Sequence, residues 1–246
     1  MAYRHGRTKT SYLPLITAIF MLCSLSSQAK DYTQAVGAVV CDGAIRGIAT
    51  HIQLPDAFNA NQSIIVTAAH VLYNPLRDQL FNQCHYRPHN KRLSGIAFEA
   101  ISKHNYSVKN KDKIAQAVND LVFIRLKKRA HQPSLKLTED LFSKVSEFSF
   151  INPIADGFKQ TSCQKIDHPH LTNDRLLLHD CPAKKGTSGS PIIDSKSGEI
   201  IAVHGGRLTV KVAKNGDENT PWIGQARRID LIAASLLNRL TSEQIN

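Results

Sequence analysis

Three short segments hold residue types that could together turn a serine hydroxyl into a nucleophile. Val66–His70 is an apolar run that ends in a histidine, Asn119–Phe123 places a single aspartate before an apolar run, and Lys185–Pro191 sets serines between glycines. An imidazole can take the proton of a serine hydroxyl, and a carboxylate can fix the tautomer of that imidazole and stabilise its charged form. In chain order, the segments therefore supply a base, the group that orients it, and a nucleophile.

The candidate groups are His70, Asp120 and Ser188, with Gly186 beside the serine. Each segment alone also fits a purely structural role, as a buried histidine, a strand cap or a turn, but the three together point to acyl transfer. Gly186 tolerates backbone conformations that can aim its N–H, with that of Ser188, at the oxygen that becomes negative in a tetrahedral intermediate. We therefore expect an oxyanion hole at Gly186 and Ser188.

Short β-rich runs separated by polar turns must position these groups. About a dozen strands at this spacing indicate β-barrels or a sandwich. The expected strands are Ala35–Cys41, Gly47–Leu54, Ile64–Thr67, Gly95–Ile101, Leu121–Leu126, Phe148–Ile151, Ser162–Ile166, Leu176–His179, Pro191–Asp194, Glu199–His204, Thr209–Val212 and Trp222–Ala226.

A helix is expected only at the end of the chain, over residues 229–246. Asp230 can cap it, and its apolar side chains fall on one face at helical spacing. That face comprises Leu231, Ile232, Leu236, Leu237 and Leu240. Polar stretches before Asp120 and over residues 127–144 divide the rest into two β units, 30–140 and 141–228.

The first 29 residues have the pattern of an export signal. Arg4, Arg7 and Lys9 precede a nearly all apolar run from Leu13 to Leu25, and small residues at Ser27 and Ala29 suit a signal peptidase. The run is shorter than the roughly 20 residues of a membrane-spanning helix. We expect cleavage after Ala29, no stable membrane anchor afterwards, and a secreted or periplasmic protein.

Cleavage at that point would remove Cys23 and leave Cys41, Cys84, Cys163 and Cys181. An even number of cysteines in an exported chain indicates two disulfides. Three pairings are possible, and pairing of nearest neighbours, Cys41 with Cys84 and Cys163 with Cys181, would give each half its own bond.

Composition excludes a disordered chain, because 42% of the 246 residues are hydrophobic and 21% are charged. Without Arg4, Arg7 and Lys9, 28 basic residues face 20 acidic ones, a net charge of +8. The excess, much of it in Lys103–Lys113 and Lys127–Arg129, fits a solvated basic face better than a nucleic-acid site, because no nucleic-acid motif accompanies it.

No metal is expected, because the spacing of the histidines fits no zinc pattern. The histidines concerned, which we place in a loop near Cys163–Cys181, are His168, His170 and His179.

With these three segments the sequence resembles the trypsin-like serine peptidases, and more closely their bacterial glutamyl endopeptidase branch, in which the serine motif reads G-x-S-G-S-P. The resemblance covers nearly the whole chain after the signal and implies two packed antiparallel β-barrels of the chymotrypsin type, an all-β fold, with a C-terminal helix. It implies that Ser188 is the nucleophile and that Ser190 only packs behind the site. The reaction needs no cofactor.

The same resemblance bears on activation and specificity. Neutral Thr187 stands where digestive enzymes have an aspartate that pairs with a newly cut N-terminus, so a chain that starts at Lys30 should be active without further cleavage. Pro182 lies near the position of the aspartate that makes trypsin cut after Lys or Arg, which disfavours that cleavage.

An acidic preference is suggested by His204, which matches the histidine that contacts the substrate glutamate in glutamyl endopeptidases. Gly205 follows it in the same wall of the specificity pocket, and Lys184 and Lys185 lie near the other wall. Ala183 departs from the pattern, because that branch usually has a hydroxyl residue there. The alternative is that His204 only packs locally.

These observations predict a monomeric secreted serine endopeptidase that acts on proteins or peptides. One rival is a catalytically silent homologue that binds a protein or polyanion. A second is a periplasmic quality-control protease, but the chain has no room for an added peptide-binding domain.

Overall fold

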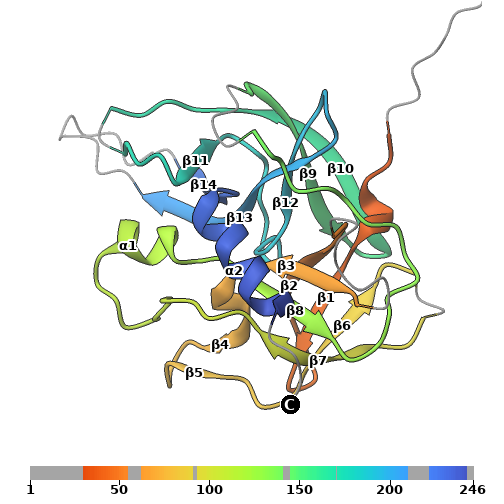
Figure 1. Ribbon diagram of the computed structural model, residues 1–246. Coiled ribbons are helices and arrows are strands. Elements are labelled where there is room, and N and C mark those ends of the chain that lie inside the picture. The colour runs from red at the N-terminus through yellow and green to blue at the C-terminus, as the bar shows by residue number, and fades with distance from the viewer. Residues whose placement is uncertain are drawn as a thin grey trace, which may run out of the picture.

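The computed structural model describes residues 30–54, 62–90, 93–140, 145–169, 171–209 and 222–242, so the expected signal segment 1–29 lies outside the described residues. Six strands of the first half close into an antiparallel barrel (Figure 1). In barrel order they are β1 (Val36–Cys41), β2 (Ala44–Ile52), β3 (Ile64–Thr67), β8 (Val122–Leu126), β7 (Ile96–Ile101) and β6 (Cys84–Pro88).

The second half forms an antiparallel sheet of six strands. In sheet order they are β10 (Gly157–Gln164), β9 (Glu147–Ile154), β12 (Pro191–Asp194), β13 (Ile200–Thr209), β14 (Trp222–Arg228) and β11 (Leu176–His179). Its two edges meet where Lys165 forms a bridge with His179 and Ile166 N donates to Leu178 O at 2.9 Å. The all-β fold with a C-terminal helix is confirmed, while the boundary at residue 140 stays a prediction.

Several short elements were not expected from the sequence. They are the 3₁₀ turns η1 (Thr33–Ala35) and η2 (Ala69–Leu72), the hairpin β4 (Tyr73–Asn74) and β5 (Gln79–Leu80), and the helix α1 (Lys113–Val118). Asp112 caps α1 by accepting from the N–H groups of Ile114 and Ala115 at 2.9 and 3.0 Å. The expected run Thr209–Val212 begins at the last residue of β13 and otherwise lies outside the described residues.

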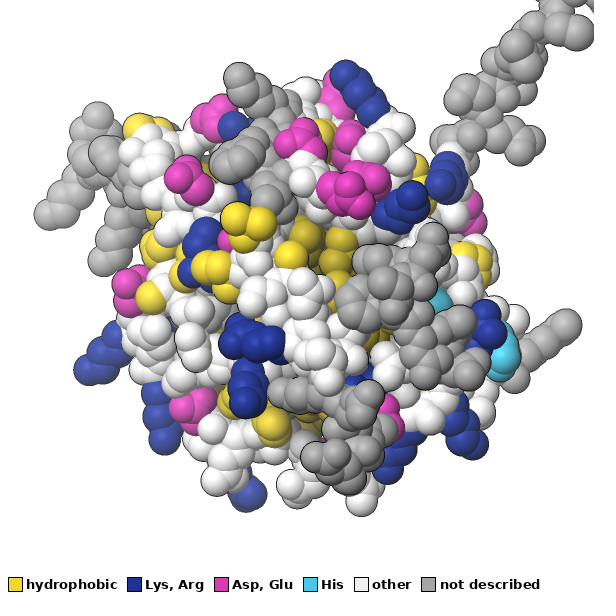
Figure 2. All heavy atoms as spheres, in the orientation of Figure 1, with side chains coloured by type: hydrophobic (Ala, Val, Ile, Leu, Met, Phe, Trp, Pro, Cys, Tyr) yellow, Lys and Arg dark blue, Asp and Glu magenta, His cyan; other side chains and the backbone are white. Residues whose placement is uncertain are grey.

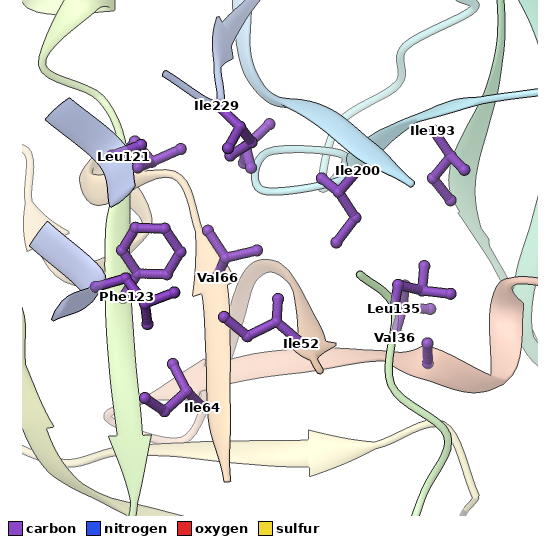
Figure 3. Packing of buried hydrophobic residues seen from close by; sticks show 14 of the residues in the cluster. Val36, Ile52, Ile64, Val66, Leu121, Phe123, Leu135, Ile193, Ile200 and Ile229 are labelled. Carbon is purple, nitrogen blue, oxygen red and sulfur yellow. The ribbon is translucent and has the colours of Figure 1, made fainter. Parts of the chain in front are cut away.

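One hydrophobic cluster joins the two halves (Figure 3). Val66 and Phe123 enter it from the barrel, Ile200 enters it from the second sheet, and Leu135 comes from the segment between them. Burial of each such side chain contributes about 1.5–3 kcal/mol. The barrel and the second sheet are therefore held together by a shared core.

The C-terminal helix α2 (Leu231–Ser242) packs on this core with part of the expected face, because Leu236, Leu237 and Leu240 contact it. Its buried side chains are Ala233, Leu237 and Leu240, at helical spacing i, i+4 and i+7. Leu231 and Ile232 are 71% and 47% exposed, so their inclusion in the buried face was wrong. They belong to the first turn, where they line a pocket together with Leu176 and Leu178 of β11.

Polar contacts fix both ends of α2. At the start, the Asp230 carboxylate accepts from Ala233 N at 2.8 Å. At the end, the buried guanidinium of Arg125 on β8 donates to Leu240 O at 2.7 Å and pairs with Glu99 at 2.8 Å. A cation at a helix C-terminus is favourable because it faces the negative end of the helix dipole.

Two disulfides close the framework. Cys41 pairs with Cys84 across β1 and β6, and Cys163 on β10 pairs with Cys181, which follows β11. This is the pairing in which each half carries its own bond. Within the described ranges, no helix is long and apolar enough to cross a membrane. On the visible face, Lys and Arg side chains lie in separate groups interspersed with acidic ones (Figure 2).

Candidate active site

Asp120 holds His70 by two hydrogen bonds. His70 lies in η2, directly after β3, and Asp120 lies between α1 and β8. The ring Nδ1 of His70 is 2.7 Å from Asp120 Oδ2, and the backbone N–H of His70 donates to Asp120 Oδ1 at 2.8 Å. Asp120 is only 3% exposed. Because a carboxylate can only accept, His70 carries its hydrogen on Nδ1, which leaves Nε2 as the acceptor that a general base requires.

Electrostatics tune His70 for this role. Burial lowers the pKa of His70, but the charge of Asp120 and its hydrogen bond to the ring outweigh burial and raise the pKa above the ordinary histidine value. The ring is therefore a stronger base than a free imidazole. Its side chain is 28% exposed, so it remains accessible to a substrate.

The segment that carries Ser188 is bonded to both halves of the molecule. Ser188 O accepts from Ile48 N on β2 at 2.8 Å, and Gly189 N donates to His204 O on β13 at 2.8 Å. Gly47 allows the close approach, because a Cβ there would lie 2.5 Å from Ser188 O and 2.7 Å from a methyl carbon of Val71, the residue after His70. The fold thus brings the Ser188 segment and the His70 segment together at Gly47.

The two serines of the motif occupy different environments. Ser188 is half-buried, whereas Ser190 is fully buried and its hydroxyl donates to Ile151 O at 2.7 Å. The hydroxyl of Ser190 is therefore committed to holding β9. This difference supports Ser188 as the nucleophile.

The turn before Ser188 has the shape expected of an oxyanion hole. Gly186 has φ +93°, a conformation that L side chains rarely adopt. Thr187 closes the turn, since its hydroxyl and its N–H both donate to Lys184 O, at 2.7 and 3.2 Å. Among the described residues, no protein acceptor receives the N–H of Gly186 or Ser188, so both are available to a substrate oxygen.

His204 forms a buried pair with His179. His179 Nε2 is 3.0 Å from His204 Nδ1, and Cys181 N donates to His179 Nδ1 at 3.2 Å. Since His179 Nδ1 accepts, His179 carries its hydrogen on Nε2 and donates it to His204 Nδ1, so His204 carries its own hydrogen on Nε2. The expectation that His179 lies in a loop was wrong, because it ends β11 and packs against Gly224 of β14.

Both rings of this pair are neutral near pH 7. Burial lowers the pKa of His179 to about 4. Burial, with the positive charge of neighbouring groups that include Arg207, lowers the pKa of His204 well below its ordinary value. Among the described residues, no group of three or more potential metal ligands is placed to hold an ion.

The remaining predicted site residues lie around His204. A Cβ on Gly205 would lie 2.8 Å from Asp120 Oδ2, so only a glycine lets β13 pass this close to the carboxylate. Ala183 is buried, and its carbonyl oxygen accepts from the guanidinium of Arg207. Arg207 was not predicted from the sequence, because its hydrogen bond to Ala183 O depends on how β13 lies beside the Ser188 segment.

A family model described as a trypsin-like peptidase domain matches residues 57–203, more than half of the 246 residues. No curated protein matches the chain.

Similar solved structures include three peptidases, all at low sequence identity. A Glu endopeptidase in complex with MPD is 13% identical with a TM-score of 0.59, and the match covers 89% of this chain and 95% of the chain of that structure. The protease Anisep from Arthrobacter nicotinovorans is 14% identical with a TM-score of 0.62, covering 87% and 99%. The thermostable serine protease AL20 from an extremophilic microorganism is 12% identical with a TM-score of 0.63, covering 86% and 99%.

At these identities the structures show a common fold, and the family model shows the relationship. The chain therefore belongs to the trypsin-like peptidase family, a family of serine endopeptidases.

Proposed function

We propose that the chain is an exported serine endopeptidase in which Ser188, His70 and Asp120 form the catalytic triad. The observation that carries this proposal is the pair of hydrogen bonds from His70 to the buried carboxylate of Asp120, at 2.7 and 2.8 Å. They fix the ring so that its basic Nε2 is left for a hydroxyl. Two disulfides, typical of chains that fold outside a reducing cytosol, support export.

The reaction follows from these roles. His70 Nε2 takes the proton of the Ser188 hydroxyl as its oxygen attacks the substrate carbonyl carbon, and the N–H groups of Gly186 and Ser188 hold the oxygen that becomes negative. The protonated ring then gives its proton to the leaving amine, which breaks the C–N bond and leaves an acyl-enzyme. Water, activated by the same ring, hydrolyses the ester and restores Ser188.

We further propose a preference for an acidic residue before the cut, with Ala183, His204 and Gly205 around its side chain. Support comes from the hydrogen-bond chain that ends at His204, because His204 Nε2 carries a hydrogen that can be donated. All three residues of the proposed triad lie on this chain, so the proposed mechanism does not require a second copy, and we propose a monomeric enzyme.

The test is digestion of a mixed peptide library by the chain starting at Lys30, beside its Ser188→Ala and Ser190→Ala variants, with cleavage sites read by mass spectrometry. We expect cuts after Glu or Asp that disappear with Ser188→Ala and persist with Ser190→Ala. Cuts after other residues would discard the acidic preference and keep the peptidase. Cleavage that persists in Ser188→Ala and is lost in Ser190→Ala would overturn the assigned nucleophile.

A further inference from the structure

Arg207 is a charged residue beside the proposed site to which the proposed mechanism gives no role. It lies on β13, three residues after His204, opposite Gly224 of β14 and just past the bulge between His204 and Gly206. Its guanidinium donates to the carbonyl oxygen of Ala183, five residues before Ser188. Arg207 therefore connects β13 with the segment that precedes Ser188, and the residue is exposed.

The buried histidine pair cannot supply a positive charge there. Cys181 N, His179 and His204 form a chain in which each ring accepts one hydrogen bond on Nδ1 and carries its only hydrogen on Nε2. A neutral N–H donor bonds more strongly to a carboxylate than to the carbonyl of a glutamine, but it accepts either side chain as a partner. A cation adds the attraction between opposite charges, which only the carboxylate receives, and it therefore increases the discrimination between Glu and Gln.

Arg207 is the cation whose position the fold fixes. Lys184 and Lys185 are exposed, whereas the guanidinium of Arg207 is held against the Ala183 carbonyl. Arg207 is also close enough to His204 for its charge to contribute to lowering the pKa of that ring. A guanidinium remains charged throughout the physiological range, and its planar fork matches the two oxygens of a carboxylate.

We propose that Arg207 is the specificity-determining residue that selects an acidic side chain before the cut, while the neutral His204–His179 pair orients it. This inference rests on the proposed peptidase function. Under this proposal the charge of the acidic side chain is recognised by Arg207 and not by His204, the residue on the same strand that the sequence indicated.

The experiment uses two fluorogenic peptides that differ only in Glu or Gln before the cut, with the chain starting at Lys30. The wild type should favour the Glu peptide in kcat/KM by about tenfold or more, which is about 1.4 kcal/mol. Arg207→Gln should bring the ratio to about one, chiefly through a loss of kcat/KM on the Glu peptide, and Arg207→Lys should give an intermediate ratio. The matched control, Arg87→Gln on the exposed side of β6, should behave like the wild type.

Two outcomes would overturn the proposal. An equal loss of kcat/KM on both peptides would mean that Arg207 only links Ala183 to β13 and does not select the substrate. An unchanged ratio in Arg207→Gln would return the selection to His204 or to the lysines.

The pH dependence separates a guanidinium from a charged histidine. Among the residues that the structure describes, the titratable or charged groups around His204 and Arg207 are His70, Asp120, His179, Asp180, Lys184 and Lys185. Ionisation of His70 affects both peptides equally and cancels in the ratio. The Glu to Gln ratio should therefore stay constant between about pH 6 and pH 9, whereas a ratio that falls across that range would assign the charge to a histidine.

A binding measurement keeps the test separate from the peptidase proposal. If neither peptide is hydrolysed, the proposed function fails, and calorimetric titration of Ser188→Ala with the same two peptides still tests Arg207. The Glu peptide should bind about tenfold more tightly, and adding Arg207→Gln should remove the difference. Equal binding of both peptides to Ser188→Ala would contradict the role of Arg207.

Discussion

The carboxylate of Asp120 binds His70 at two points, the ring Nδ1 and the backbone N–H. Asp120→Asn keeps the size and the burial of this side chain but replaces one acceptor by an NH₂ group. We expect kcat to fall by about 10³–10⁴-fold, because an amide nitrogen facing the ring forces the hydrogen onto the wrong nitrogen.

The measurement is kcat on a peptide that the wild type cleaves, with thermal unfolding of both proteins to confirm that the variant is folded. Asp120→Ala serves as the control that removes the acceptor without offering a donor. A folded Asp120→Asn with less than a tenfold loss would rule out the assigned orientation of His70.

The raised pKa of His70 also sets the pH at which the enzyme works. Protonation of Nε2 removes the base, so activity is lost as the pH falls through the pKa of His70 and gained as it rises. The Asp120 charge raises this pKa against the opposing effect of burial. The midpoint of the pH profile of kcat/KM should therefore lie above the ordinary histidine value of 6.5. A midpoint clearly below 6.5 in the free enzyme would show that Asp120 does not control the ring.

At the scale of elements, α2 ties the sheet to the barrel through a narrow stripe of apolar side chains. Leu237 is buried in the shared core, so Leu237→Ala should lower the free energy of unfolding by about 2–4 kcal/mol through lost burial and the cavity left behind. The measurement is urea unfolding followed by circular dichroism.

The matched control is Ile232→Ala on the same helix. Ile232 is 47% exposed, and we expect a change within about 0.5 kcal/mol. Similar losses for the two variants would mean that Ile232 packs in the core as the sequence pattern predicted, which would contradict its exposed position in α2.

Elements with a clear local pattern could be predicted, and the others depend on partners distant in the chain. β3 and β8 are mostly apolar, so the positions of His70 and Asp120 beside them could be predicted. β6 has the polar sequence CHYRP, with only Tyr86 and Pro88 buried, and becomes a strand because β1 and β7 pair with it. The helix α1 is too short to show helical periodicity.

At the scale of the whole molecule, chain order predicted the triad candidates but not how the strands lie beside one another. The contact between His179 and His204 requires β11, β14 and β13 to be neighbours in one sheet, and a local pattern carries no such information. Arg207 was missed for the same reason. The shared core around Val66, Phe123 and Ile200 likewise joins segments that are far apart in the chain.

The most direct test of the account is covalent labelling of the chain starting at Lys30 by a fluorophosphonate, which reacts with activated serines. Peptide mass spectrometry then identifies the labelled residue, and His70→Ala serves as the control. We predict one adduct per chain, on Ser188, and none in His70→Ala. Labelling of Ser190, or labelling of Ser188 that does not depend on His70, would contradict the proposed active site.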